Sequence, residues 1–498
     1  MSPSFPPANW PQELIVSTFS YLTLVELSNL RLASKELADL VAQGDFRQYY
    51  RTKHVDATPE SLGEFVHMTK PGLLGAQVKH IVLTGVAIST EHLEQIVKER
   101  ARWVTEGNGP IFSSTQHKLD DAEVAEAKKE LDGLRRRKKE LKGFHESGVA
   151  DALMTEAFVN VAAYSRNGKL SSLVLDVEVF RENLVQRRRP IESRAKQAVW
   201  QTASSTFRVA MAGLAESGLP LNTLDAFTRP WHCSLGWSAL SHCVDGSQSS
   251  QLSRSLHGLQ SLALSLSHDL KPADASEVER RHRPAEEQTA LADFVALCPE
   301  LTHLHLHWFL PGSADRKGIT ADQLLRNVAG SPSLQRLENL TLRGLRVQGL
   351  TLLDLIKGAP LNDLCLEEVI ITDPDPVPED IDDESDPEAD VRPTPRPDFK
   401  PIHSSGWNAI FAHCSSPEAD MSSILFDDLW GERLLHFRNG GGPQKMPWTP
   451  HTKDSPTLER KGEDVRREIE YTYARGRPLC SPQAYMWRQM RQREYGPA

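Results

Sequence analysis

The sequence predicts an α/β fold in which short parallel strands alternate with helices, and three observations support this prediction. Eight segments share a leucine pattern in which apolar and polar residues alternate, as in a strand that is buried on one side. Stretches with helical spacing of apolar residues lie between these segments, as connections between parallel strands require. The 498 residues, 39% of them hydrophobic, suffice for about three domains or for one long repetitive array.

Composition and charge exclude several classes of protein. No run of ~20 apolar residues exists, and the first thirty residues lack the pattern of a secretory signal. The six cysteines form no CxxC pair, which favours reduced thiols. The net charge of −10 comes from ten acidic residues between Asp373 and Asp390, since the remaining acids and bases number 57 each. We therefore expect a cytoplasmic or nuclear protein that binds neither nucleic acid nor a membrane.

Residues 9–43 predict three short helices joined by tight turns. Pro11 and Glu13 suit the first turn of a helix. Thr23 and Glu26 form a capping box for a second helix, and Ser34 can cap a third. The apolar positions of the first two helices are Leu14, Ile15, Phe19, Leu22, Leu27 and Leu30. A unit this small needs a partner or the rest of the chain to complete its core.

This segment resembles the F-box, the adaptor-docking motif of cullin-type ubiquitin ligases. The matching positions are Pro11, Glu13, Leu14, Ile15, Phe19, Leu22, Leu27, Leu30, Arg31, Ser34 and Lys35. The resemblance covers about a tenth of the chain. It implies an F-box over residues 9–50 whose matching residues bind a Skp-type adaptor, which in turn holds a cullin. The alternative interpretation is a helical cap on a larger fold.

The pattern L-x-x-L-x-L recurs along the rest of the chain. Clear copies occupy residues 78–86, 170–177, 259–266, 301–308, 337–345 and 361–369, with weaker copies at 221–227 and 421–429. The pattern is similar to a leucine-rich-repeat array, in which stacked strands line a concave face. The copies begin 24 to 92 residues apart, whereas regular repeats span ~20–29 residues. We expect an irregular leucine-rich-repeat-like solenoid over residues 51–371; unrelated buried strands are the alternative.

Two insertions and the C-terminal region have their own character. Residues 117–146 predict a helix, with acids early, bases late and an apolar stripe that docks on the repeats: Val124, Ala127, Leu131, Leu134 and Leu141. The basic run Arg135–Lys139 is interpreted as a solvated helix end rather than an import signal. Residues 372–398, rich in acid and proline, predict a disordered loop. Residues 399–498 predict a last repeat and a cap, with a mixed-charge helix near Arg466–Arg475.

No catalytic motif was found, and no cofactor is expected. A P-loop, a GxSxG elbow, an HExxH motif and a G-x-G-x-x-G motif are all missing from the sequence. His232–Cys233 and His242–Cys243 have the wrong spacing for a zinc site, so no metal is expected there.

The strand at 301–308 places three histidines on the face opposite its leucines. A metal site is one hypothesis, because imidazoles two residues apart lie ~7 Å from each other. Neighbouring copies supply no good further ligand, so a polar recognition surface is favoured. The predicted substrate-binding residues are His303, His305, His307, Arg343, Asp363 and Glu367.

Together the resemblances imply a non-enzymatic substrate-recognition subunit. The F-box would dock the Skp-type adaptor, and the repeats would present an unknown protein substrate for cullin-dependent ubiquitination. A scaffold that uses the same two regions without directing degradation is the alternative. An enzyme built on a repeat scaffold is a third hypothesis, and it depends on the histidine strand alone.

Overall fold

The computed structural model of the chain describes residues 14, 17–18, 22, 24–33, 35, 51–71, 77–106, 113–165, 168–180, 187–188, 196–229, 233–244, 246–267, 285–308, 322–372, 406–431, 434–438 and 454–473. The chain forms two compact units. Unit 1 comprises residues 1–227 and 246–257, and unit 2 comprises residues 228–245 and 258–498.

Unit 1 is built on a mostly parallel sheet with the order β1-β2-β5-β7. These strands are β1 (Thr52–Asp56), β2 (His80–Ile88), β5 (Ser172–Phe180) and β7 (Thr223–Ala226). The two-residue strand β6 (Arg187–Arg188) pairs antiparallel with β5. The helices that pack on the sheet or on each other are α5 (Pro59–Thr69), α8 (Val149–Tyr164), α9 (Lys196–Ser217) and α11 (Gly246–Leu256).

Local sequence explains how α5 and α9 are placed. Thr58 caps α5, because its side chain accepts a hydrogen bond from the amide of Ser61, and Pro59 occupies the first turn. The buried face of α5 repeats at helical spacing: Leu62, Phe65, Val66 and Thr69. α9 lies directly on β2, where a Cβ atom at Gly85 would overlap the Thr206 side chain. Glycine at this position therefore permits the close approach of helix and sheet.

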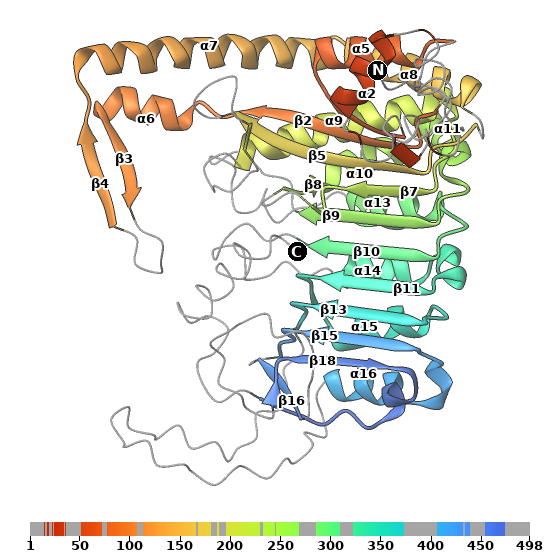
Figure 1. Ribbon diagram of the computed structural model, residues 1–498. Coiled ribbons are helices and arrows are strands. Elements are labelled where there is room, and N and C mark those ends of the chain that lie inside the picture. The colour runs from red at the N-terminus through yellow and green to blue at the C-terminus, as the bar shows by residue number, and fades with distance from the viewer. Residues whose placement is uncertain are drawn as a thin grey trace, which may run out of the picture. The chain divides into compact units, whose positions relative to one another are not determined.

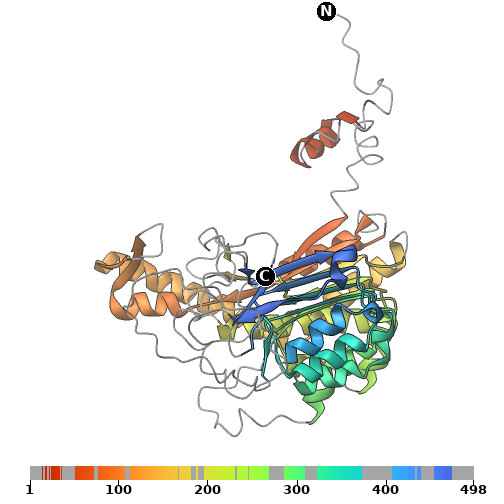
Figure 2. The same ribbon diagram turned by 90° about the horizontal axis from the view of Figure 1, so that it is seen from below.

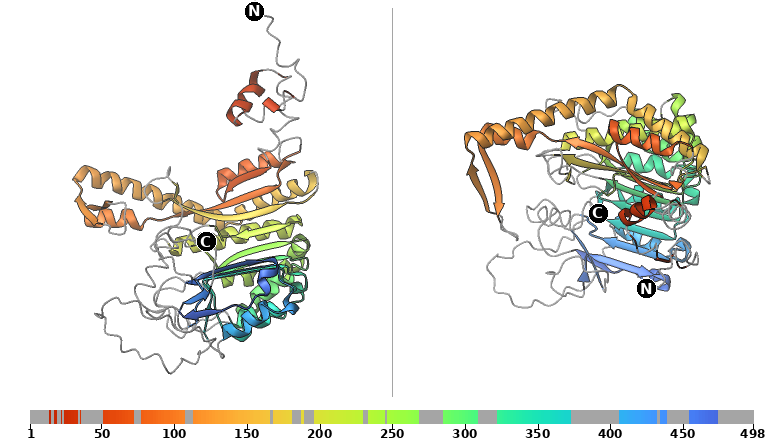
Figure 3. Two further views of the ribbon diagram at one scale, coloured as in Figure 1. Left: turned by 60° about the horizontal axis from the view of Figure 1, so that its bottom comes forward. Right: turned by 45° about the horizontal axis from the view of Figure 1, so that its top comes forward.

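A helical arm follows β2 and extends past its carboxyl end (Figures 1 and 3). It consists of α6 (Glu91–Glu99), the antiparallel hairpin β3 (Ala101–Glu106) and β4 (Ser113–Lys118), and α7 (Asp121–Glu146). α7 begins with a capping box between Asp120 and Glu123 and is about 39 Å long at 1.5 Å per residue. The apolar stripe of α7 packs against β2, α6 and Phe180 in one buried cluster: Val86, Ile88, Leu93, Ile96, Ala127, Leu131, Leu134, Leu141 and Phe180.

Unit 2 is built on parallel strands stacked in chain order, with helices on one side of them (Figures 1 and 2). The strands are β8 (Leu235–Gly236), β9 (Ser261–Ser267), β10 (His303–Trp308), β11 (Asn339–Arg343), β13 (Asp363–Glu367) and β15 (Ser423–Asp427). The helices are α10 (Trp237–Val244), α13 (Ala285–Ala296), α14 (Asp322–Ala329), α15 (Gly349–Lys357) and α16 (Gly406–Cys414). The pattern residues pair in register from β9 to β15, and all are buried: Leu262, Leu304, Leu340, Leu364 and Ile424.

The strand at the end of the main sheet of unit 2 runs antiparallel to its neighbour. β18 (Thr457–Lys461) pairs antiparallel with β15, and beside it lies the antiparallel sheet of β16 (Leu435–Arg438), β17 (Asp454–Ser455) and β19 (Tyr471–Tyr473). Small parallel strands β12 (Arg346–Val347) and β14 (Ile370–Ile371) follow β11 and β13. The core here is aromatic, with ring centroids 5.2–6.1 Å apart among Trp407, Phe411, Phe426, Phe437 and Tyr471. These rings pack against one another and so stabilise this end of the sheet.

The predicted α/β fold is confirmed: all eight leucine-pattern segments contain a strand, and the described pairings of these strands with one another are parallel. The predicted helix at 117–146 is confirmed from Asp121 onward, because residues 113–118 form β4 instead. The predicted helix near Arg466–Arg475 is wrong: a short 3-10 helix (Gly462–Arg466) precedes strand β19. Residues 373–398 lie outside the described residues. In the described part of the chain, no helix is both long and apolar enough to cross a bilayer.

Candidate functional site

The F-box residues are described only in part. α2 (Leu24–Ala33) begins directly after Thr23, as the capping box predicts, and contains Leu27, Leu30 and Arg31. Leu14 is 57% exposed, and Leu32, which the sequence analysis did not select, is 87% exposed. Leu22 and Leu30 are half-buried and Lys35 is exposed. The remaining matching positions lie outside the described residues: Pro11, Glu13, Ile15, Phe19 and Ser34.

The histidine strand lies where the sequence placed it. Leu304 and Leu306 of β10 are buried, and the three histidines alternate with them along the strand. His303 pairs with Ser261 on β9 and with Asn339 on β11. One strand further, β13 brings the predicted residues Asp363 and Glu367 into the same rows of the sheet. The predicted neighbours are therefore confirmed, but their exposure differs along each strand.

Burial increases from His303 to His307. His303 is exposed, His305 is half-buried, and only 5% of His307 is exposed. The Nδ1 atom of His307 lies 2.9 Å from Oγ of Ser265, and that hydroxyl donates to the carbonyl of Cys233 at 3.1 Å. Because the hydroxyl has one proton, His307 must donate from Nδ1. Burial, then the nearby charge of Arg343, lowers the pKa of His307 well below 6.5. His307 is therefore a neutral interior group, which corrects its assignment to a surface.

Arg343 is likewise an interior residue, with 6% of its surface exposed. Its guanidinium lies 3.6 Å from Glu367 and 3.5 Å from Glu368. Glu368 directly follows β13 and has a left-handed backbone with φ of 53°. Gly344 and Asp428 have the same conformation directly after β11 and β15, so a repeated turn ends all three strands. Arg343 is thus held by internal carboxylates, and its predicted role as a direct substrate contact is corrected.

The residues that stay accessible define a smaller surface, which we call the polar face of unit 2. It lies on β10, β11 and β13 and consists of His303, His305, Asn339, Thr341, Asp363, Cys365 and Glu367, each exposed or half-buried. Hydroxyl, amide, imidazole and carboxylate groups there can donate and accept hydrogen bonds. Such a mixed surface can form hydrogen bonds with a polar ligand.

A scan against protein-family models matches no family. A search of curated proteins finds no relative. Assignments for this chain therefore depend on its own residues and their geometry.

The described residues also contain no metal site. No three His, Cys, Asp or Glu side chains among them converge as metal ligands require. Cys233 and Cys243 are buried, while His242 is exposed and His232 lies outside the described residues. Burial raises the pKa of Cys243, Cys298 and Cys414 to about 12, so these thiols are unreactive near neutral pH. Of the described cysteines, Cys365 on the polar face is the one that is not buried.

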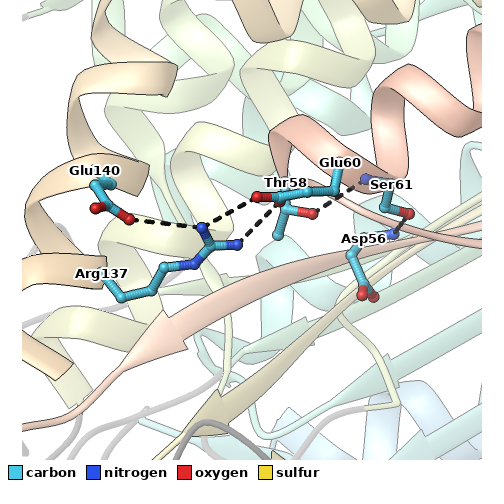
Figure 4. A network of polar contacts seen from close by, with 6 residues as sticks. All are labelled: Asp56, Thr58, Glu60, Ser61, Arg137 and Glu140. Carbon is cyan, nitrogen blue, oxygen red and sulfur yellow. Dashed lines mark hydrogen bonds and ion pairs between the residues drawn. The ribbon is translucent and has the colours of Figure 1, made fainter. Parts of the chain in front are cut away.

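The basic run of α7 forms a second polar site, in unit 1 (Figure 4). Arg137 donates two hydrogen bonds to Glu60 of α5, at 3.2 and 2.9 Å, and lies 3.6 Å from Glu140. Arg135 donates to Glu94 of α6 at 2.9 Å. These hydrogen bonds lower the pKa of Glu60 and of Glu94. The interpretation as a solvated run is confirmed, since four of its five residues are exposed, but its place at a helix end is wrong, because the run lies within α7. Two of its arginines join α7 to neighbouring helices.

Proposed function

We propose that this chain is a substrate-recognition subunit of a cullin-type ubiquitin ligase. Residues 9–50 would dock a Skp-type adaptor as an F-box, and the polar face of unit 2 would bind the protein substrate. The observation that carries the proposal is the exposure of Leu14 and Leu32 on short helices of the F-box-like segment. Large apolar side chains that remain in water on so small a helical unit favour a protein partner.

The arrangement of unit 2 supports the second half of the proposal. Its parallel strands keep their pattern residues in register from β9 to β15, as a leucine-rich-repeat-like solenoid requires. Helices cover one side of these strands (Figure 2). On β10, β11 and β13, polar residues alternate with buried leucines and therefore lie on the other side. On this proposal the chain supplies no catalytic group. It holds the substrate near the ligase and so raises the effective concentration of substrate lysines.

Adaptor docking is tested by purifying the full chain from cells and measuring the bound adaptor and cullin. Leu14→Ala combined with Ile15→Ala should reduce both at least tenfold, because apolar contacts at the centre of an interface dominate its affinity. Leu350→Ala is the matched control, since Leu350 is an exposed leucine on α15 of unit 2. Adaptor binding at the wild-type level in the double variant would refute the F-box assignment.

Substrate capture is tested in the same purification. His303→Glu combined with Asp363→Lys adds a carboxylate at one position of the polar face and reverses the charge at another, which should remove captured partners while adaptor binding stays unchanged. His257→Glu with Asp354→Lys provides the control, because both residues are exposed, His257 belongs to unit 1, and Asp354 lies on α15 and not on the strands of this face. Partner turnover that requires residues 9–43 supports a ligase subunit. Stable partners that still co-purify with adaptor indicate the alternative, a scaffold that does not direct degradation.

A further inference from the structure

A groove in unit 1 has the chemistry of a binding site. It is a cavity of about 720 Å³ between α5, α7 and the carboxyl ends of β1, β2 and β5. Apolar side chains from the strand ends line part of it: Val86, Ile88 and Phe180. In sheets of parallel strands, ligands bind at this carboxyl edge. We call this cavity the α5–α7 groove.

The charged residues that line the α5–α7 groove are unbalanced. Four carboxylates belong to Asp56, Glu60, Glu64 and Glu140, while two guanidiniums belong to Arg136 and Arg137, so the lining has a net charge of −2. Figure 4 shows Arg137 directed at Glu60 and Glu140, which leaves its charge compensated within the wall. Glu64 is exposed on α5, one helical turn beyond Glu60. The groove therefore attracts cations and repels phosphate or nucleic acid.

We propose that the α5–α7 groove binds a basic segment of a partner protein by enclosing one lysine or arginine side chain. The methylene groups of such a side chain would contact the parts of Phe180 and Val86 that are exposed at the groove, and its cation would lie beside the carboxylates of Glu64 and Glu140. Long basic side chains combine an apolar stem with a charged end, and this groove offers an apolar base with an acidic wall.

Gly133 of α7 is a position at which a larger side chain can fill the groove. It lines the cavity, and a Cβ atom added there would meet no atom within 4 Å. A larger side chain at this position can therefore enter the cavity without disturbing the packing of α7. Gly143, on the same helix, is equally open but does not line the groove. The two glycines form a matched pair in which only one substitution fills the site.

The experiment measures binding of peptide libraries to the purified full-length chain. Nonapeptides with a fixed central lysine or arginine and random flanking positions are compared with libraries whose central residue is glutamine or glutamate. We expect at least tenfold enrichment of the basic libraries, decreasing as salt rises from 50 to 500 mM, because the charges are near solvent. Gly133→Met should reduce the enrichment at least tenfold, and Gly143→Met should leave it unchanged.

A charge variant separates electrostatics from shape. Glu64→Gln should weaken binding several-fold, and Glu156→Gln, an exposed glutamate of α8 away from the groove, should not. Equal enrichment of glutamine libraries, equal binding by the Gly133→Met variant, or no enrichment of any library would overturn the proposal. The assay contains no adaptor or cullin, so its outcome is independent of the F-box assignment.

Discussion

Two arginines, one in each unit, each lie between two glutamates, yet their surroundings differ. Arg343 of unit 2 is buried and its contacts with Glu367 and Glu368 are long, at 3.6 and 3.5 Å. Arg137 of unit 1 lies near solvent and makes shorter hydrogen bonds with Glu60, at 2.9 and 3.2 Å. The shorter contacts thus belong to the pair that water screens more strongly.

Distance alone therefore does not decide which of these ion pairs contributes more to stability. Water screens the charges of Arg137 and Glu60, so removing one partner leaves the other solvated. Around Arg343 water is scarce, and removing the cation would leave two largely buried carboxylates next to each other. The longer contacts of unit 2 are therefore expected to matter more for stability.

The two candidate binding sites also differ in the charged groups that they present. In unit 2 the guanidinium of Arg343 is compensated inside the protein, and the polar face carries uncharged hydrogen-bonding groups beside the carboxylates of Asp363 and Glu367. In unit 1 the lining of the α5–α7 groove contains four carboxylates and two guanidiniums. A salt-sensitive partner is thus expected at unit 1, and a partner bound mainly by hydrogen bonds is expected at unit 2.

The largest effect is expected at Arg343. Arg343→Ala should lower the free energy of unfolding by about 3 kcal/mol, because it leaves Glu367 and Glu368 without their cation in a buried site. Urea denaturation followed by circular dichroism measures this loss. The triple change Arg343→Met, Glu367→Gln and Glu368→Gln should recover most of it, since no net charge then stays buried. A loss below about 1 kcal/mol for Arg343→Ala would show that the site behaves like a surface pair.

A smaller, pH-dependent effect is expected at His307. Its pKa in the folded chain is well below 6.5, so below pH 6.5 the unfolded chain binds a proton that the folded chain does not. Stability is therefore complete above pH 6.5 and decreases as the pH falls, by up to about 1.4 kcal/mol per pH unit for one proton. His307→Gln should remove this part of the pH dependence, measured by urea denaturation between pH 5 and 8. His303→Gln, on the exposed end of the same strand, should leave the slope unchanged; an equal effect of both variants would contradict the burial argument.

Sequence patterns predict the repeated part of this fold well and its exceptions poorly. Alternation of leucines located the eight strands that carry the pattern, because burial of one face imposes a period of two on each of them. The pattern could not locate β1 (Thr52–Asp56), whose sequence TKHVD has a single buried apolar residue. The wrong helix near Arg466–Arg475 followed from its charges, whereas the Tyr-Thr-Tyr segment within it favours a strand.

The candidate site shows the same limit. Alternation correctly placed His303, His305 and His307 on one face, but it cannot tell that burial increases along the strand. One of the two carboxylates beside Arg343 belongs to Glu368, whose left-handed backbone could not be predicted because the residue is not glycine. The α5–α7 groove was not predicted at all, because Glu64 and Gly133 are separated in the sequence by β2, α6 and the β3–β4 hairpin.

The smallest effect is expected at Arg137, where the comparison with Arg343 is sharpest. Arg137→Ala should lower the free energy of unfolding by about 0.5–1 kcal/mol at pH 7, since the pair with Glu60 has good geometry but lies near solvent. The Arg137 hydrogen bond lowers the pKa of Glu60 from 4.5, so this stability is complete above pH 4.5 and is lost as the pH falls through the lowered value. Urea denaturation of variant and wild type from pH 3 to 7 measures the difference. Arg136→Ala, the neighbouring arginine for which no ion pair is observed, is the control and should change nothing. A loss at Arg137 that equals the loss at Arg343, or one that persists at pH 3, would show that exposure does not decide the strength of these pairs.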